Sequence, residues 1–208
     1  ESLRQRSELE EWVASSRPAA RIEWRRWWNW HFVTHPQSSY PEFAGVRVAI
    51  LGSLWMIALT MATALPVGVA AGVYLEEYAD RAKTVNRIVQ TNINNLAGVP
   101  SIIYGILGLT VFVRALEPIT SGAILGVGDP TTANGRTILS ASLTMALLIL
   151  PVIIISTQEA VRTVPASVRQ ASYAVGATRW QTVRHHVLPL AVPGILTGTI
   201  LSMSRALG

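Results

Sequence analysis

Residues 159–193 read EAVRTVPASVRQASYAVGATRWQTVRHHVLPLAVP, a polar and basic stretch between two apolar segments. A single acid, Glu159, accompanies a larger basic set: Arg162, Arg169, Arg179, Arg184, His185 and His186. Inside the stretch, the small residues from Gln170 to Val175 predict a short helix. The helix should end at Gly176, because glycine adopts the left-handed conformation past a helix end without steric cost. We therefore expect a short helix and a sharp turn in a loop that joins two membrane spans.

The spacing within this loop resembles the EAA loop of ABC importer permeases, in which Glu-Ala-Ala, three residues, Gly and nine residues precede Ile-x-Leu-Pro. Ala171, Gly176 and Leu188-Pro189 match, whereas Gln170, Ser172 and His186 replace the expected Glu, Ala and Ile. In that family the loop forms a cytoplasmic coupling helix that docks on the ATP-hydrolysing subunit. The alternative is a basic loop that only follows the positive-inside rule. The resemblance implies these ATPase-coupling residues: Gln170, Ala171, Ser172, Tyr173, Gly176 and Ala177.

Composition indicates a membrane protein. Of the 208 residues half are hydrophobic and only 14% are charged, against about 25% in a soluble domain. The net charge is +5, but the arginines flank apolar segments and form no aromatic-interleaved patch, which argues against nucleic-acid binding. The absence of cysteine excludes disulfides and thiolate metal sites. No metal site is predicted. A membrane-embedded enzyme is disfavoured because all four histidines lie outside the expected spans: His31, His35, His185 and His186.

Apolar runs long enough to cross a bilayer predict an all-α, polytopic membrane helical bundle. We expect spans at about 48–73, 96–113, 138–156 and 187–207, with a cytoplasmic coupling loop at 157–186 and a transmembrane domain over 46–208. Gly194 and Gly198, four residues apart, predict a close helix contact in lipid. Because the chain lacks an initiator Met and stops within an apolar pattern, we also expect further spans beyond both ends.

Residues 1–45 differ from the rest, with equal numbers of arginines and glutamates, a helical pattern over 1–16, and Trp24, Trp27, Trp28 and Trp30. Two interpretations remain open: a small extramembrane domain with a tryptophan core, or an amphipathic segment on the membrane surface. The loops 76–90 and 157–186 carry more basic residues than the loop 114–136, so we expect them in the cytoplasm and residues 1–45 outside it.

Four stretches of residues 50–208 resemble the PstA-type permeases of phosphate ABC importers, which belong to the MetI-like family. They are GSLWMIALTMATALPVGVAAGVYLEEYA (52–79), NINNLAGVPSIIYGILGL (92–109), LLILPVIIISTQEAVRTVP (147–165) and GATRWQTVRHHVLPLAVPGILTGTI (176–200). The resemblance implies a permease in the bacterial inner membrane that shares the phosphate pathway with a PstC-type sister permease. It also implies a PstS-type periplasmic binding protein and a PstB-type ATPase dimer. ATP and Mg would bind to that dimer, so this chain would be neither an enzyme nor a cofactor binder.

Four polar residues near span ends are candidates for the translocation pathway: Arg205, Glu159, Asn95 and Ser101. A charge at membrane depth suggests a functional site, and the guanidinium fork of Arg205 matches an oxyanion. Alternatively, Arg205 pairs with an acid of the sister permease or extends to the membrane boundary. Glu159 could instead pair with Arg162 or Arg169, and Asn95 could serve helix entry and helix-to-helix hydrogen bonding. An importer of sulfate, molybdate or phosphonate, and a membrane scaffold or sensor without transport, remain alternative functions.

Overall fold

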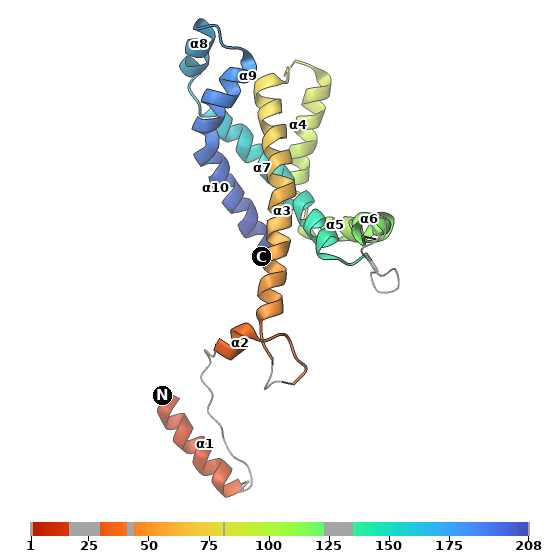
Figure 1. Ribbon diagram of the computed structural model, residues 1–208, viewed down its shortest axis with the longest axis vertical. Coiled ribbons are helices and arrows are strands. Elements are labelled where there is room, and N and C mark those ends of the chain that lie inside the picture. The colour runs from red at the N-terminus through yellow and green to blue at the C-terminus, as the bar shows by residue number, and fades with distance from the viewer. Residues whose placement is uncertain (1, 17–29, 41–43, 81, 123–134, 208) are drawn as a thin grey trace. The chain divides into compact units, whose positions relative to one another are not determined.

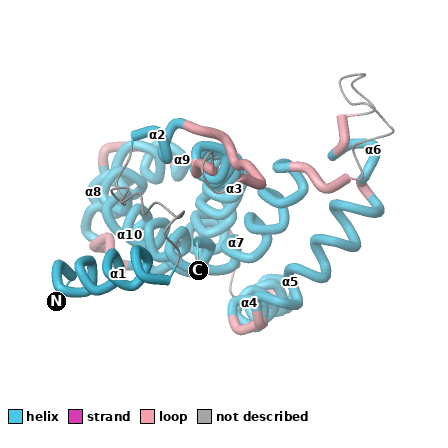
Figure 2. Tube along the Cα trace, turned by 90° about the horizontal axis from the view of Figure 1, so that it is seen from below, coloured by secondary structure: helices cyan, strands magenta, loops and turns pink. Residues whose placement is uncertain are grey.

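The computed structural model describes residues 2–16, 30–40, 44–80, 82–122 and 135–207. The chain divides into two units, residues 1–50 and 51–208, which we describe separately. Every described element is a helix or a loop (Figure 2). The predicted all-α class is therefore confirmed for the described part of the chain.

In the first unit, helix α1 (Ser2–Ser16) forms where the sequence predicts it. A second, short helix, α2, covers Trp30–Thr34. The Leu9 and Trp12 side chains of α1 are exposed. Trp24, Trp27 and Trp28 lie outside the described residues, so the two interpretations of this segment stay open.

Within the described residues, three helices are long and apolar enough to cross a membrane. The first is α3 (Arg47–Val73), which continues into a π-helical turn, η1 (Tyr74–Tyr78). The second is α7 (Ile138–Arg162). The third combines α9 (Arg179–Thr182), the π-helical turn η4 (Val183–Val187) and α10 (Leu188–Leu207). All three extend beyond the predicted spans at the end that carries residues 74–83 and 157–186, because hydropathy marks only the apolar part of a helix.

The remaining predicted span, 96–113, is not one straight helix. Helix α4 (Thr84–Ala97) ends where that span was expected to begin, and α5 (Ser101–Gly108) continues into η2 (Leu109–Ala115) at an angle of 103° to α4. Figure 1 shows α5 turning away from α4. Pro100 explains the break, because it lacks a backbone N–H and disfavours the helical conformation of Val99. The short helix α6 (Glu117–Thr120) follows.

Helix α10 packs on α7 through the predicted glycine pair. A Cβ at Gly194 would lie 2.8 Å from Cβ of Ala160, and one at Gly198 would lie 2.3 Å from Cβ of Ser156. Small residues allow the two helix backbones to approach this closely. Close packing matters in lipid because apolar side chains gain no hydrophobic free energy when they exchange lipid contacts for helix contacts. The predicted role of Gly194 and Gly198 is therefore confirmed.

Helix α3 meets α7 in a similar way. A Cβ at Gly72 would lie 2.7 Å from Cβ of Thr157. Further along, the Thr60 hydroxyl of α3 donates to the Ser142 carbonyl oxygen of α7 at 3.2 Å. In the other direction, the Ser142 hydroxyl donates to the Met56 carbonyl oxygen at 3.2 Å. Such bonds between helices satisfy polar groups away from water. Helix α7 is thus held on two sides.

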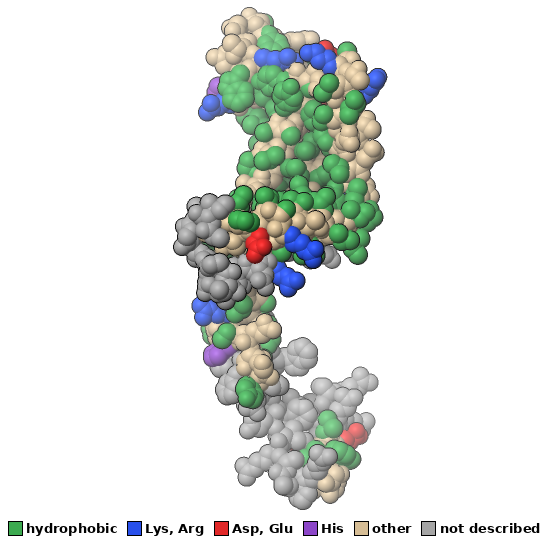
Figure 3. Space-filling model, turned by 90° about the vertical axis from the view of Figure 1, so that its right-hand side faces the viewer, with side chains coloured by type: hydrophobic (Ala, Val, Ile, Leu, Met, Phe, Trp, Pro, Cys, Tyr) green, Lys and Arg blue, Asp and Glu red, His purple; other side chains and the backbone are tan. Residues whose placement is uncertain are grey.

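Charged side chains gather at the ends of the second unit, with a band of hydrophobic side chains between them (Figure 3). We call one end the basic end: it comprises η1, the first turns of α4, the last turns of α7, and α8 (Ala166–Ala174) with α9. These elements lie together in Figure 1. The apolar band matches the hydrocarbon layer that a spanning bundle requires.

Candidate functional site

The EAA-like loop forms helix α8, which begins at Ala166, directly after Pro165, rather than at Gln170. It ends at Gly176, whose φ is +82°. The Gly176 N–H donates to the Tyr173 carbonyl at 3.0 Å and the Ala177 N–H to the Ser172 carbonyl at 3.1 Å. This pair of bonds closes a helix through a left-handed glycine. The prediction that Gly176 ends the helix is confirmed.

One face of α8 and the turn after it are exposed. Gln170, Ala171 and Tyr173 lie on the surface, and the Val175 side chain is 84% exposed. None of the described atoms lies within 4 Å of a Cβ placed at Gly176. The surface that carries Tyr173 and Val175 is therefore not covered by any other part of the chain that the structure describes.

Ser172 does not share that face, although the resemblance implied a coupling role for it. Ser172 is only 5% exposed and Thr182 is fully buried, and the Oγ of Ser172 lies 2.9 Å from the Oγ1 of Thr182. Ala177 is half-buried. Ser172 therefore attaches α8 to α9 inside the chain.

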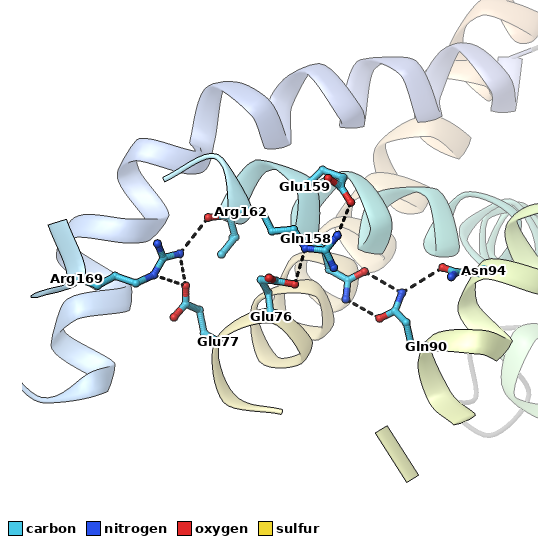
Figure 4. Close-up of polar contacts among 9 residues, drawn as sticks. Glu76, Glu77, Gln90, Asn94, Gln158, Glu159, Arg162 and Arg169 are labelled. Atoms are coloured by element: carbon cyan, nitrogen blue, oxygen red, sulfur yellow. Dashed lines mark hydrogen bonds and ion pairs between the residues drawn. The ribbon is translucent and has the colours of Figure 1, made fainter. Parts of the chain in front are cut away.

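Arg169, on the inner side of α8, makes the most extensive polar contacts of the loop (Figure 4). Its Nε donates to Oε1 of Glu77 at 2.9 Å, and its Nη2 donates to the same oxygen. Nη1 donates to the Val164 carbonyl at 2.7 Å and Nη2 to the Val161 carbonyl at 3.0 Å. The Arg169 and Glu77 side chains are 19% and 8% exposed. A buried charge pair with its remaining donors satisfied resists separation, because each charge left alone would lack solvent.

Glu159 pairs with Arg162, the first of its two predicted partners. Arg162 Nη1 lies 2.7 Å from Oε1 of Glu159, and its Nε lies 3.0 Å from Oε2 of Glu76. The Glu159 and Arg162 side chains are 63% and 41% exposed, whereas that of Glu76 is 11% exposed. Arg169 binds Glu77 instead. Glu159 thus lies in a largely exposed ion pair at the basic end.

Amide groups connect α4 to α7 nearby. Gln158, only 2% exposed, donates to the Gln90 side-chain oxygen at 2.7 Å, and the Gln90 amide donates back at 3.2 Å and to Asn94 at 3.1 Å. Together with the ion pairs they form what we call the polar network, whose members are Glu76, Glu77, Gln90, Asn94, Gln158, Glu159, Arg162 and Arg169 (Figure 4). Most of these contacts were not predicted, because they join residues far apart in the sequence.

Arg205, at the far end of α10, lies beside the bend between α4 and α5. Its Nη1 donates to the Ala97 carbonyl, the last of α4, at 3.3 Å, and the residue is exposed. Asn95 and Ser101 flank the same bend in the sequence and are also exposed. The structure therefore brings Arg205 to the bend, while Glu159 lies apart at the basic end. Across the ranges that the structure describes, His, Asp and Glu form no cluster that could hold a metal ion.

Comparison with known proteins agrees with this architecture. Residues 64–208 match the family described as "Binding-protein-dependent transport system inner membrane component". The chain is 33% identical over 180 residues to the probable ABC transporter permease protein YqgI of Bacillus subtilis, covering 86% of this chain and 55% of that protein. It is 32% identical over 200 residues to the phosphate transport system permease protein PstA 1 of Mycobacterium tuberculosis, covering 95% and 58%.

It is also 33% identical over 172 residues to the phosphate transport system permease protein PstC 2 of Mycobacterium bovis, covering 79% and 52%. The chain thus spans a little over half the length of these relatives. Among solved structures, an inward-facing form of the MetNI methionine ABC transporter matches with a TM-score of 0.51 and 22% identity, over 78% of this chain and 68% of that one. That likeness shows the fold alone.

The family match covers well over half of the chain, and the relatives are named as permeases of ABC and phosphate transport systems. The bundle of apolar helices has the fold of a MetI-like permease. The resemblance seen in the four stretches is confirmed. The chain belongs to the family of inner membrane components of binding-protein-dependent transport systems.

Proposed function

We propose that this chain is the membrane-spanning permease subunit of an ATP-driven phosphate importer, located in the bacterial inner membrane. The observation that carries the proposal is the exposed surface of α8 and Gly176, attached to the spans through the buried Arg169–Glu77 pair. A permease needs such a surface to receive motion from a separate ATPase. The names of the PstA and PstC relatives support phosphate as the substrate.

The coupling step follows from this surface. A PstB-type ATPase dimer binds ATP and Mg, and docks on the exposed residues of the loop: Gln170, Ala171, Tyr173, Val175 and Gly176. Closure of the dimer displaces α8 and switches the spans between inward- and outward-facing states. Hydrolysis takes place on the ATPase, so the chain itself is no enzyme. The basic end then faces the cytoplasm and residues 1–45 lie on the other side, in agreement with the larger number of basic residues in the loops 76–90 and 157–186.

Phosphate reaches the chain from a PstS-type binding protein and crosses between this permease and a PstC-type sister. Arg205 is the candidate for oxyanion contact in the pathway, because its guanidinium is exposed and makes one long hydrogen bond to Ala97, at 3.3 Å. Its other donors are available for the planar, bidentate contact that an oxyanion favours. Asn95 and Ser101, on either side of the bend, would complete this part of the pathway.

A second candidate is an importer of another oxyanion, such as sulfate, molybdate or phosphonate. The name of YqgI gives no substrate, and a guanidinium binds tetrahedral oxyanions by the same geometry. A scaffold or sensor module without transport is a further candidate, which predicts that function survives loss of the contact between α8 and the ATPase.

The test uses the full-length protein, co-expressed with its neighbouring ATPase and sister permease and reconstituted with the binding protein. ATP-dependent uptake of labelled phosphate is measured with and without excess sulfate or molybdate. Phosphate uptake that neither competitor reduces supports phosphate as the substrate. Arg205→Gln should then lower phosphate uptake while the complex assembles normally. Uptake abolished by a competitor assigns the permease to another oxyanion, and no uptake from an assembled complex contradicts transport.

A further inference from the structure

Arg169 connects three elements that are separate in the sequence. It belongs to α8, it binds Glu77 at the end of the α3–η1 helix, and it binds two carbonyl groups around the end of α7. Glu77 and Arg169 lie 92 positions apart in the chain. The guanidinium therefore joins the first and second long helices, α3–η1 and α7, to the helix that the resemblance identifies as the coupling helix.

The other contacts of α8 lead elsewhere. It follows α7 directly through residues 163–165, and its packing is mainly against α9 and η4, which lead into α10. The Ser172–Thr182 hydroxyl pair belongs to that side. Motion of α8 can thus be transmitted to α7 through the connecting backbone, and to α10 through the packing of α8 on α9 and η4. Among the described residues, the hydrogen bonds that join α8 to α3–η1 are those of Arg169 to Glu77.

We infer that Arg169 is a positioning residue that makes the first span, α3–η1, follow the coupling helix when that helix moves. This inference rests on the proposed function. The ion pair suits the role because it is charge-assisted and largely buried, with two guanidinium N–H groups on one carboxylate oxygen. Separating such a pair is costly, because each charge would be left buried without its partner. The two carbonyl bonds orient the guanidinium, so the three helices move as one body around it. The pair stays intact throughout the transport cycle.

The adjacent residue provides a matched control. Glu76, one position before Glu77 in η1, also binds an arginine, Arg162. That arginine belongs to α7 rather than α8, and its side chain is 41% exposed. Removing the charge of Glu76 weakens an ion pair of the same chemistry in the same turn, yet leaves the link from η1 to α8 in place.

The first experiment compares Glu77→Gln with Glu76→Gln in the full-length chain, assembled with its ATPase, sister permease and binding protein in vesicles. The measured quantity is phosphate imported per ATP hydrolysed. Glu77→Gln should lower this ratio by roughly fivefold or more, the range of a typical coupling interaction, while the rate of ATP hydrolysis stays within about twofold. Glu76→Gln should keep the ratio of the unaltered transporter. Equal ratios for the two variants, whether high or low, would overturn the inference.

The second experiment separates linkage from charge and from folding. Because residues 1–208 contain no cysteine, Glu77→Cys and Arg169→Cys can be combined, in a full-length protein and partners freed of any other reactive cysteine, and joined by a short bismaleimide. The double variant should couple poorly until it is cross-linked, and cross-linking should restore the ratio, whereas either single-cysteine variant should show no response. A cross-link that forms without restoring transport, or that blocks it, would overturn the inference. Absence of ATP-dependent uptake by the unaltered transporter would overturn the proposed function itself, which is a separate result.

Discussion

The middle of the helix bundle and its basic end are held together by different chemistry. In the middle, α3 and α10 approach α7 through Gly68 and Gly198, with no room for a further methyl group. At the basic end, charges and amides join η1, α4, α7 and α8, from the buried Arg169–Glu77 pair to the exposed Arg162–Glu159 pair. The difference follows from solvent. Helices in hydrocarbon gain contact through small residues, whereas charges are tolerated where partners or water surround them.

The two regions therefore contribute differently to the structure of the bundle. Close backbone packing has one favourable arrangement, so the middle of the bundle sets how the helices cross. The polar contacts at the basic end are directional and differ greatly in burial, so their individual contributions to the free energy of unfolding should differ widely. Substitutions at these contacts should therefore change the free energy of unfolding, measured in detergent or lipid, by clearly different amounts.

The largest effect is expected for Arg169→Ala. Removing this guanidinium leaves the Glu77 carboxylate buried without its partner, and breaking a buried pair in this way costs about 3–5 kcal/mol. Reversible unfolding of the purified protein measures it. Arg162→Ala is the comparison, because that side chain is 41% exposed and water can take its place. Its cost should be clearly smaller, although the variant also removes one partner of Glu76, which is 11% exposed. Similar losses for both variants would remove the distinction between buried and exposed pairs.

The second-largest loss of unfolding free energy is expected for Gly72→Ala. The new Cβ would lie 2.7 Å from Cβ of Thr157 and 2.9 Å from the Ile154 carbonyl oxygen, and overpacking of this kind costs about 1–3 kcal/mol. Gly52→Ala in the same helix is the control, since none of the described atoms lies within 4 Å of its added Cβ. It should be neutral or slightly stabilising, because alanine favours a helix. If Gly72→Ala matched its control, glycine would not set the α3–α7 contact.

A smaller effect is expected for Ser172→Ala. The variant removes one hydroxyl of the buried Ser172–Thr182 pair, while Thr182 keeps its 3.1 Å bond to the Thr178 carbonyl. A loss of about 1 kcal/mol is therefore expected, the usual contribution of one hydrogen bond. A loss as large as that of Arg169→Ala would show that α8 depends on α9 as much as on η1.

The smallest effect is expected for Glu159→Gln. Its carboxylate is 63% exposed and pairs with an arginine that keeps Glu76. Solvent-exposed ion pairs contribute about 1 kcal/mol at most, and often much less. The difference from the unaltered protein should shrink further in high salt, since screening weakens exposed pairs. A clear destabilisation that persists in high salt would contradict this interpretation.

Local and periodic features could be predicted from the sequence, and contacts between distant residues could not. Gly176 ends a helix whatever the tertiary structure, and the four-residue spacing of Gly194 and Gly198 places both on one helix face. By contrast, nothing in the sequence relates Arg169 to Glu77, and hydropathy favours a straight span over 96–113 although Pro100 breaks it. The orientation of Ser172 was also inaccessible, because it depends on where Thr182 lies.

The central claim is that the exposed surface of α8 couples this permease to an ATPase, and Val175→Asp tests it most directly. Val175 is 84% exposed, so the variant should fold normally and yet lose ATPase binding during co-purification and ATP-dependent uptake. Val85→Asp is the control, because Val85 is 69% exposed in the first turn of α4, at the same end of the bundle, and an acid near a helix start is favourable. Loss of both activities in Val175→Asp alone is the predicted result. Full ATPase binding and uptake in that variant would contradict the claim.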